Sequence, residues 1–157
     1  MIDVAEGGSR LVEDQGGLTR WGISHRAYPD LDIASLTRTH AEDIYFRDFW
    51  RPIKGNALPP ALALVLFDAA VNLGPSQAVK LLQSCLRVTV DGVCGPETVA
   101  AAKMFLPRAE LVALFLEIRL RFYDSLAQKY THHRPSIYGW RMRVMRLALE
   151  AGRWRWS

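Results

Sequence analysis

Acidic and hydroxyl side chains near the start of the chain are of the types that hydrolyse glycosidic bonds. Such hydrolysis requires a carboxylic acid that protonates the leaving oxygen and a second group that stabilises the cationic transition state or activates water. Glu6, Asp14 and Thr19 offer this set. Two glycines follow Glu6 and leave room for a bulky polymer, and the glycine-containing turn between Asp14 and Thr19 can fold both toward Glu6.

The spacing of these three residues does not select the chemistry by itself. A Glu, an Asp and a Thr within about fourteen residues occur in many proteins, and a surface hairpin with solvated acids is the simpler interpretation. Apolar neighbours such as Trp21 would raise the pKa of a nearby carboxyl group and let it hold its proton near neutral pH. The set is therefore a candidate general-acid site.

Two polar residues on an otherwise apolar stretch form a second candidate group. Asp68 and Asn72 stand four residues apart and so project from one face of a helix. A polar pair on a buried helix needs partners, because each unsatisfied group costs about 1–3 kcal/mol. Structural hydrogen bonding and direct contact with a substrate both stay open for this pair.

Aromatic residues at helical spacing form a third group. Tyr45, Phe49 and Trp50 can share one face of a helix, and aromatic faces stack well on sugar rings. Tyr45 and Trp50 are therefore candidate substrate contacts. Core packing is the alternative role.

The spacing of apolar residues predicts a mainly α chain with a small β or loop element near its N-terminus. Residues 6–24 contain five glycines, which favours a hairpin-like or irregular segment there. Gly74 followed by Pro75 is typical of a helix end. Helices are expected over residues 38–50, 61–73, 76–86, 97–104, 109–130 and 137–151.

Length and composition indicate an ordinary folded protein with a basic surface. The 157 residues are 50% hydrophobic and 23% charged, which argues against disorder. The net charge of +4 favours polyanionic partners such as nucleic acid, anionic lipid or cell-wall polymer. Basic residues are most frequent near the C-terminus, where they alternate with tryptophans; the simplest interpretation is an exposed helix face whose aromatics pack inward.

Cysteine usage and hydropathy further limit the classes of protein to which this sequence could belong. Cys85 and Cys94 lack the spacing of a zinc site, so no metal is expected and both are expected to be free thiols. The opening residues 1–8 have neither the basic nor the apolar region of a signal peptide. The longest apolar run, near residues 61–70, is interrupted by Asp68 and is too short to span a bilayer. Synthesis in the cytoplasm without stable membrane insertion is expected.

Four separated runs of the sequence form a pattern of motifs. The runs are EGG at 6–8 with DQGGLTRWGIS at 14–24, IYFRDFWRP at 44–52, FDAAVNLG at 67–74 and DGVCGPET at 91–98. They resemble, in the same order, the motifs of glycoside hydrolase family 108, whose members include phage endolysins and secretion-associated muramidases. The fourth run is similar to the family's C-terminal peptidoglycan-binding module.

This resemblance implies a lysozyme-like helical fold and cleavage of the β-1,4 bond between N-acetylmuramic acid and N-acetylglucosamine, with no metal or organic cofactor. It assigns Glu6 as the catalytic glutamate, and it matches Asp14 and Thr19 to positions that complete a Glu/Asp/Thr set. Inversion with Asp14 or Thr19 positioning water is favoured, and retention stays open. The expected organisation is a lysozyme-like catalytic region over residues 1–75 and a peptidoglycan-binding-like helical region over 76–157, packed as one unit.

Two other functions were weighed against a muramidase. A non-catalytic cell-wall-binding module would keep residues 91–98 and the basic C-terminus without needing Glu6. Nucleic-acid binding is disfavoured, because no nucleic-acid-binding motif accompanies the charge. The expected partner is the glycan strand of peptidoglycan. The protein is expected to be a monomer that acts in the periplasm or cell wall after release through another protein.

Overall fold

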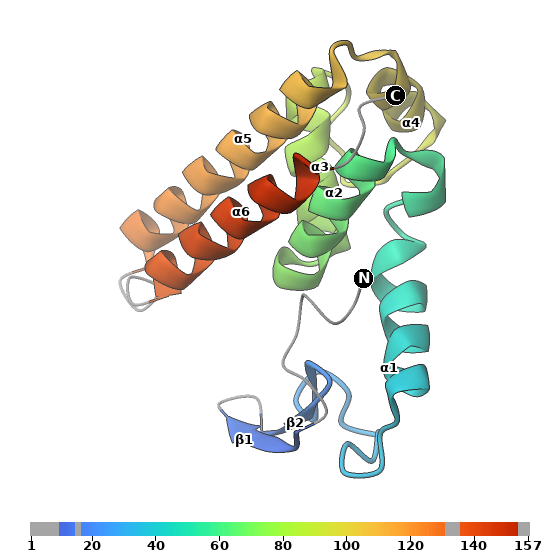
Figure 1. Ribbon diagram of the computed structural model, residues 1–157, viewed down its shortest axis with the longest axis vertical. Coiled ribbons are helices and arrows are strands. Elements are labelled where there is room, and N and C mark those ends of the chain that lie inside the picture. The colour runs from blue at the N-terminus through green and yellow to red at the C-terminus, as the bar shows by residue number, and fades with distance from the viewer. Residues whose placement is uncertain (1–9, 15–16, 131–135, 154–157) are drawn as a thin grey trace. The chain divides into compact units, whose positions relative to one another are not determined.

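The computed structural model describes residues 10–14, 17–130 and 136–153. The chain divides into two compact units, Met1–Asp48 and Phe49–Ser157, each of which is described by itself. The first contains a small sheet and one helix, and the second is a bundle of helices (Figure 1). The mainly α fold with a small β element near the N-terminus is therefore confirmed.

The sheet of the first unit is a three-stranded antiparallel meander. Its strands are β1 (Val12–Asp14), β2 (Gly17–Arg20) and β3 (Ile23–Ser24), in that order. Trp21 and Gly22 connect β2 to β3, and both have positive φ angles, of 54° and 75°. A two-residue turn with both residues in the left-handed region matches the twist of a tight hairpin, which explains the glycine at the second position.

A helix completes the first unit. α1 spans Arg38–Tyr45, and Thr37 caps its start by accepting a hydrogen bond from the His40 amide at 3.2 Å. The predicted helix over residues 38–50 does not continue unchanged, because its last part is the π-helical turn η2 (Phe46–Trp50). The core of this unit consists of Ile23, Ile33, Leu36, Ala41, Ile44 and Tyr45.

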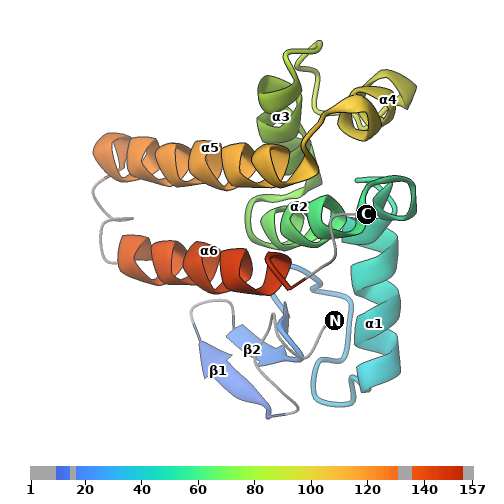
Figure 2. The same ribbon diagram turned by 45° about the horizontal axis from the view of Figure 1, so that its top comes forward.

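The second unit is built around a central helix, α2. This helix is apolar on nearly all sides, which is typical of a fully buried helix, and it packs against α3, α5 and α6. α5 and α6 lie side by side (Figure 2). The elements are η3 (Gly55–Ala57), α2 (Pro60–Leu73), α3 (Pro75–Leu86), α4 (Pro96–Met104), α5 (Arg108–Lys129) and α6 (Ile137–Ala151). Within the described ranges, no helix has the length and apolar character needed to cross a bilayer.

The break between α2 and α3 depends on Gly74. Its φ of 86° lies in the region that favours glycine, and its amide donates to the Ala70 carbonyl at 2.9 Å. Pro75 then begins α3, where its missing N–H costs nothing. The predicted helix end at this position is confirmed.

A buried amide holds the loop between α3 and α4. Gln83 is 1% exposed, and its Nε2 donates to Asp91 Oδ1 at 2.7 Å, to the Val93 carbonyl at 3.0 Å and to Thr98 Oγ1 at 3.2 Å. Its Oε1 accepts from the amides of Asp91 at 3.1 Å and Gly92 at 2.8 Å. The Gln83 side chain therefore provides hydrogen-bond partners for most polar groups of the turn that begins the DGVCGPET run.

Replacing Gln83 by leucine should loosen this loop. The variant keeps the side chain's size but leaves several polar groups without a partner, so the free energy of unfolding should fall by at least about 2 kcal/mol. Urea denaturation measures the loss, and hydrogen exchange at the Asp91 and Gly92 amides should become faster. Gln128→Leu, at an exposed position of α5, is the control and should change stability by less than about 0.5 kcal/mol. Equal effects of the two variants would contradict this role.

Candidate active site

The β1–β2 ladder places two of the three candidate catalytic residues. Asp14 pairs with Gly17, and Thr19 pairs with Val12, so Asp14 and Thr19 occupy register positions on the same face of the ladder. Thr19 is half-buried, and its hydroxyl donates to the Gly17 carbonyl at 3.3 Å. Glu6 lies outside the described residues. The hairpin expected between Asp14 and Thr19 is confirmed, whereas the catalytic roles of all three residues stay predictions.

Tyr45 supports the turn that follows Thr19. It is 2% exposed, and its hydroxyl donates to the Trp21 carbonyl at 3.1 Å, so α1 holds the positive-φ turn in place. The indole Nε1 of Trp21 is buried and has no hydrogen-bond partner among the described residues. Tyr45 thus has a packing role within the first unit, and its contact with a sugar stays a prediction.

Trp50 belongs to the second unit. Its Nε1 donates to Asn56 Oδ1 at 2.9 Å, and its ring meets Phe67 edge-to-face with the centroids 5.5 Å apart. A Cβ at Gly55 would collide with the Trp50 ring, so glycine is required there. Trp50 remains half-buried, and stacking of a sugar on its ring stays a prediction.

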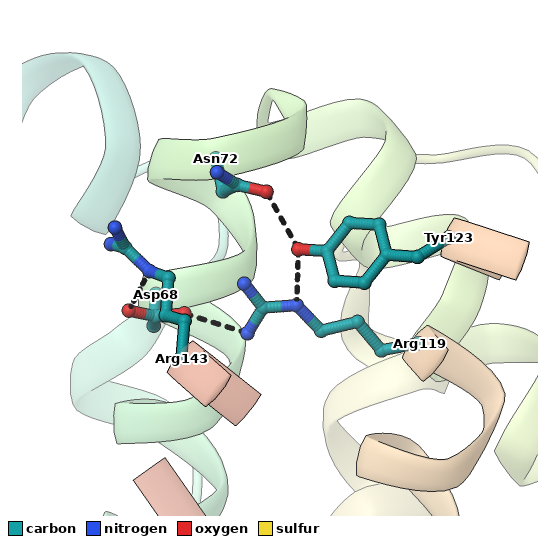
Figure 3. Close-up of polar contacts among 5 residues, drawn as sticks. All are labelled: Asp68, Asn72, Arg119, Tyr123 and Arg143. Atoms are coloured by element: carbon teal, nitrogen blue, oxygen red, sulfur yellow. Dashed lines mark hydrogen bonds and ion pairs between the residues drawn. The ribbon is translucent and has the colours of Figure 1, made fainter. Parts of the chain in front are cut away.

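Asp68 of α2 is the centre of an ion cluster that joins three helices (Figure 3). Arg119 of α5 lies 2.6 Å from Oδ2, and Arg143 of α6 donates through Nε to Oδ1 at 2.8 Å. The Arg119 side chain has 0% exposure, whereas that of Arg143 keeps 24%. A wholly buried guanidinium requires a carboxylate partner, and Asp68 is that partner.

Asn72 continues the same network one turn further along α2. Its Oδ1 accepts a 2.6 Å hydrogen bond from the Tyr123 hydroxyl, which in turn accepts one from Arg119 Nε at 2.8 Å (Figure 3). Burial raises the pKa of Tyr123, so its hydroxyl remains a donor over the ordinary pH range. Of the two roles left open for Asp68 and Asn72, structural hydrogen bonding is the one that these contacts support. Substrate contact stays a prediction.

A pocket of the first unit was not anticipated from sequence. It has a volume of about 500 Å³ and is lined by Ala27, Tyr28, Pro29, Asp30, Leu31, His40, Asp43, Ile44 and Arg47. Beside it, the Tyr28 hydroxyl donates to Asp48 Oδ2 at 2.8 Å, and Arg47 donates to both oxygens of Asp48, at 2.6 and 2.7 Å. Tyr28 and Asp48 are twenty residues apart, and no sequence periodicity predicts their contact.

Electrostatics within this group favour neutral Tyr28 and ionised Asp48. Burial, followed by the hydrogen bond to Asp48, raises the pKa of Tyr28 to about 12. The hydrogen bonds from Arg47 lower the pKa of Asp48. Arg47 of the pocket wall is therefore paired with Asp48.

Comparison with known families assigns both halves of the chain. Residues 1–74 match the family described as Glycosyl hydrolase 108. Residues 77–145 match the family described as Predicted Peptidoglycan domain. The protein is a glycoside hydrolase that acts on peptidoglycan.

The chain is also similar to solved structures. Eleven chains match, among them the structure of Brucella abortus SagA, which is 26% identical and has a TM-score of 0.68. The match covers 94% of this chain and 91% of that chain. No curated protein matches this chain. Among the described residues, no group of three His, Cys, Asp or Glu side chains is arranged to hold a metal ion.

Asp68→Asn should strongly destabilise the protein. Removing one partner of a buried ion pair leaves an uncompensated charge and costs about 3–5 kcal/mol. The control is Asp124→Asn, which breaks the exposed pair between Asp124 and Arg141 and should cost less than about 1 kcal/mol. Urea denaturation measures both. A folded, fully stable Asp68→Asn protein that had lost hydrolysis would instead favour substrate contact.

Tyr28→Phe should destabilise the protein in a pH-dependent way. The pKa of Tyr28 is raised from the ordinary tyrosine value of 10 to about 12 in the folded protein. The hydroxyl therefore stabilises the fold fully below pH 10, and this stabilisation is lost as the pH rises toward about 12. At pH 8 the variant should be less stable than wild type by about 1 kcal/mol, and the difference should shrink between pH 10 and 12. Urea denaturation across this range tests it, with Tyr138→Phe, at an exposed position, as the control. A difference that stayed constant with pH would refute the assignment.

Proposed function

We propose that the protein is an N-acetylmuramidase in which Glu6 is the general acid. The observation that supports this most directly is the family 108 match over residues 1–74, which contains Glu6 and the whole hairpin. Within that match, Asp14 and Thr19 occupy register positions on one face of the β1–β2 ladder, which would allow both to approach the same substrate. The bond cleaved is the β-1,4 link from N-acetylmuramic acid to N-acetylglucosamine.

In the proposed reaction, protonated Glu6 gives its proton to the glycosidic oxygen, and the bond from C1 of N-acetylmuramic acid to that oxygen breaks. Water adds its oxygen to C1 and gives a proton to the Asp14 carboxylate, with the Thr19 hydroxyl orienting it. The products are a free hydroxyl on N-acetylglucosamine and a reducing N-acetylmuramic end. Attack by water from the face opposite the leaving group gives inversion.

The helical region supplies the second part of the proposal. Residues 77–145 match a peptidoglycan domain, and within them Gln83 holds the loop that begins at Asp91. We place wall binding in this region and glycan cleavage at the hairpin. Action by a monomer in the periplasm or cell wall, reached through another protein, completes the proposal.

Glu6→Gln tests the catalytic assignment. Loss of a general acid should lower the rate of wall lysis by about 10²–10⁴-fold while the circular dichroism spectrum is unchanged. The matched control is Glu13→Gln, which removes an exposed carboxylate from β1. It should keep near wild-type lysis. Residual activity of Glu6→Gln above a tenth of wild type would remove Glu6 from the role.

The products of peptidoglycan digestion by the wild-type protein identify the glycosidic bond that is cleaved. Mass spectrometry of muropeptides released from purified peptidoglycan should show reducing N-acetylmuramic ends. Reducing N-acetylglucosamine ends would instead show that the protein is an N-acetylglucosaminidase and not a muramidase. Wall binding without any released muropeptide would favour the non-catalytic wall-binding module.

A further inference from the structure

Helix α6 has two faces, of which the inner one attaches it to the bundle. Val144, Leu147 and Ala151 are buried. Trp140 packs on Tyr123 with the ring centroids 4.9 Å apart. Together with the ion pair from Arg143 to Asp68, these contacts account for how α6 is held.

The outer face carries a continuous apolar stripe. Tyr138, Met142, Met145 and Leu149 follow one another at spacings of four, three and four residues, so they lie within about 60° of one another around the helix. Tyr138 is 74% exposed, Met145 60% and Leu149 73%, and Met142 between them is half-buried. Single exposed apolar residues are common, but three exposed ones in a row on one helix face form a patch that indicates an interaction surface. We call these four residues the outer stripe.

Positive charge borders the outer stripe on both sides. Helical spacing puts Arg141 along one edge and Arg146 along the other. Arg141 forms an exposed ion pair with Asp124 at 2.7 Å, whereas Arg146 has no ion-pair partner among the described residues. The single carboxylate of α6, Glu150, lies away from the stripe and pairs with Arg153 at 3.5 Å. The outer face is therefore apolar in the middle and basic at its edges.

We propose that the outer stripe docks α6 flat on the surface of an anionic phospholipid bilayer. Apolar side chains enter the boundary between headgroups and acyl chains, while the arginines pair with lipid phosphates. Wall polymer offers anionic groups for the arginines but no apolar layer for Tyr138, Met145 and Leu149, whereas a lipid surface accommodates both. The 15 residues of α6 measure about 22 Å, shorter than the hydrocarbon core, which fits a helix lying on the surface.

This inference extends beyond the proposed function. No residue of the outer stripe belongs to the hairpin that carries Asp14 and Thr19 or to the loop that Gln83 holds. Membrane adsorption and glycan cleavage are therefore separable by mutation.

Co-sedimentation with lipid vesicles tests the proposal. The wild-type protein should pellet with vesicles of equal parts phosphatidylglycerol and phosphatidylcholine, and far less with phosphatidylcholine alone. The double variant Met145→Gln with Leu149→Gln should lower the partition coefficient at least about tenfold, because two apolar side chains no longer leave water. Met104→Gln with Leu106→Gln removes two equally exposed apolar side chains from another site and should bind as wild type does.

A charge variant tests the basic edge. Arg146→Gln should lower binding to the anionic vesicles about fivefold, since each arginine near such a surface contributes about 1 kcal/mol. Arg121→Gln, at an exposed position of α5, is the matched control. Absence of wild-type binding to anionic vesicles, or unchanged binding of the Met145/Leu149 variant, overturns the proposal. So does a wild-type dimer that this variant dissociates, because the outer stripe would then be an interface between two copies.

Discussion

The geometry of the helical unit depends on one carboxylate. Asp68 stands on the central helix and binds Arg119 and Arg143, so it fixes α5 and α6 against α2 through a single group. A wholly buried guanidinium resists rotation or sliding of its helix, because a shift away from the carboxylate leaves its charge uncompensated. Replacing such a cluster by apolar side chains can be neutral in stability. What the cluster contributes is a single permitted arrangement of the three helices.

The functional halves of the chain and its compact units do not share a boundary. The family 108 match ends at residue 74 and the peptidoglycan domain begins at 77, whereas the compact units divide after Asp48. α2 therefore lies within the residues that match the hydrolase family, and by packing it is the central helix of the helical bundle. The predicted boundary between residues 75 and 76 stays a prediction. A hydrolase region ending at residue 74 would leave the apolar α2 without the helices that bury it.

Local patterns were sufficient to predict most of the elements from sequence. The apolar spacing identified the helices, Gly74 with Pro75 gave the end of α2, and the glycines before Gly22 indicated the hairpin. The π-helical turn at Phe46–Trp50 was missed because its apolar spacing is the same as that of a continuing α-helix. The pairing of Tyr28 with Asp48 was missed for a different reason, since it joins a loop to a helix end twenty residues later.

Candidate site residues were harder to interpret, because the same side chain suits a substrate and a structural partner. Asp68 and Asn72 were recognised as polar groups on a buried helix, but Arg143, which binds Asp68, lies 75 residues away, and Tyr123, which binds Asn72, lies 51 residues away. No pattern within α2 indicates which distant residue will supply the donor. Glu6, Asp14 and Thr19 were selected by family resemblance rather than by spacing. Of these, only the relative register of Asp14 and Thr19 follows from the described hairpin.

The two faces of α6 connect the buried cluster with the surface. Arg143 and Trp140 engage Asp68 and Tyr123 on the inner side, which fixes the rotation of the helix about its own axis. Because side chains four residues apart share a face, fixing that rotation also fixes where the outer stripe points. A surface that is already ordered loses little conformational entropy when it binds. The outer stripe is thus held ready for docking by the same network that orders the core.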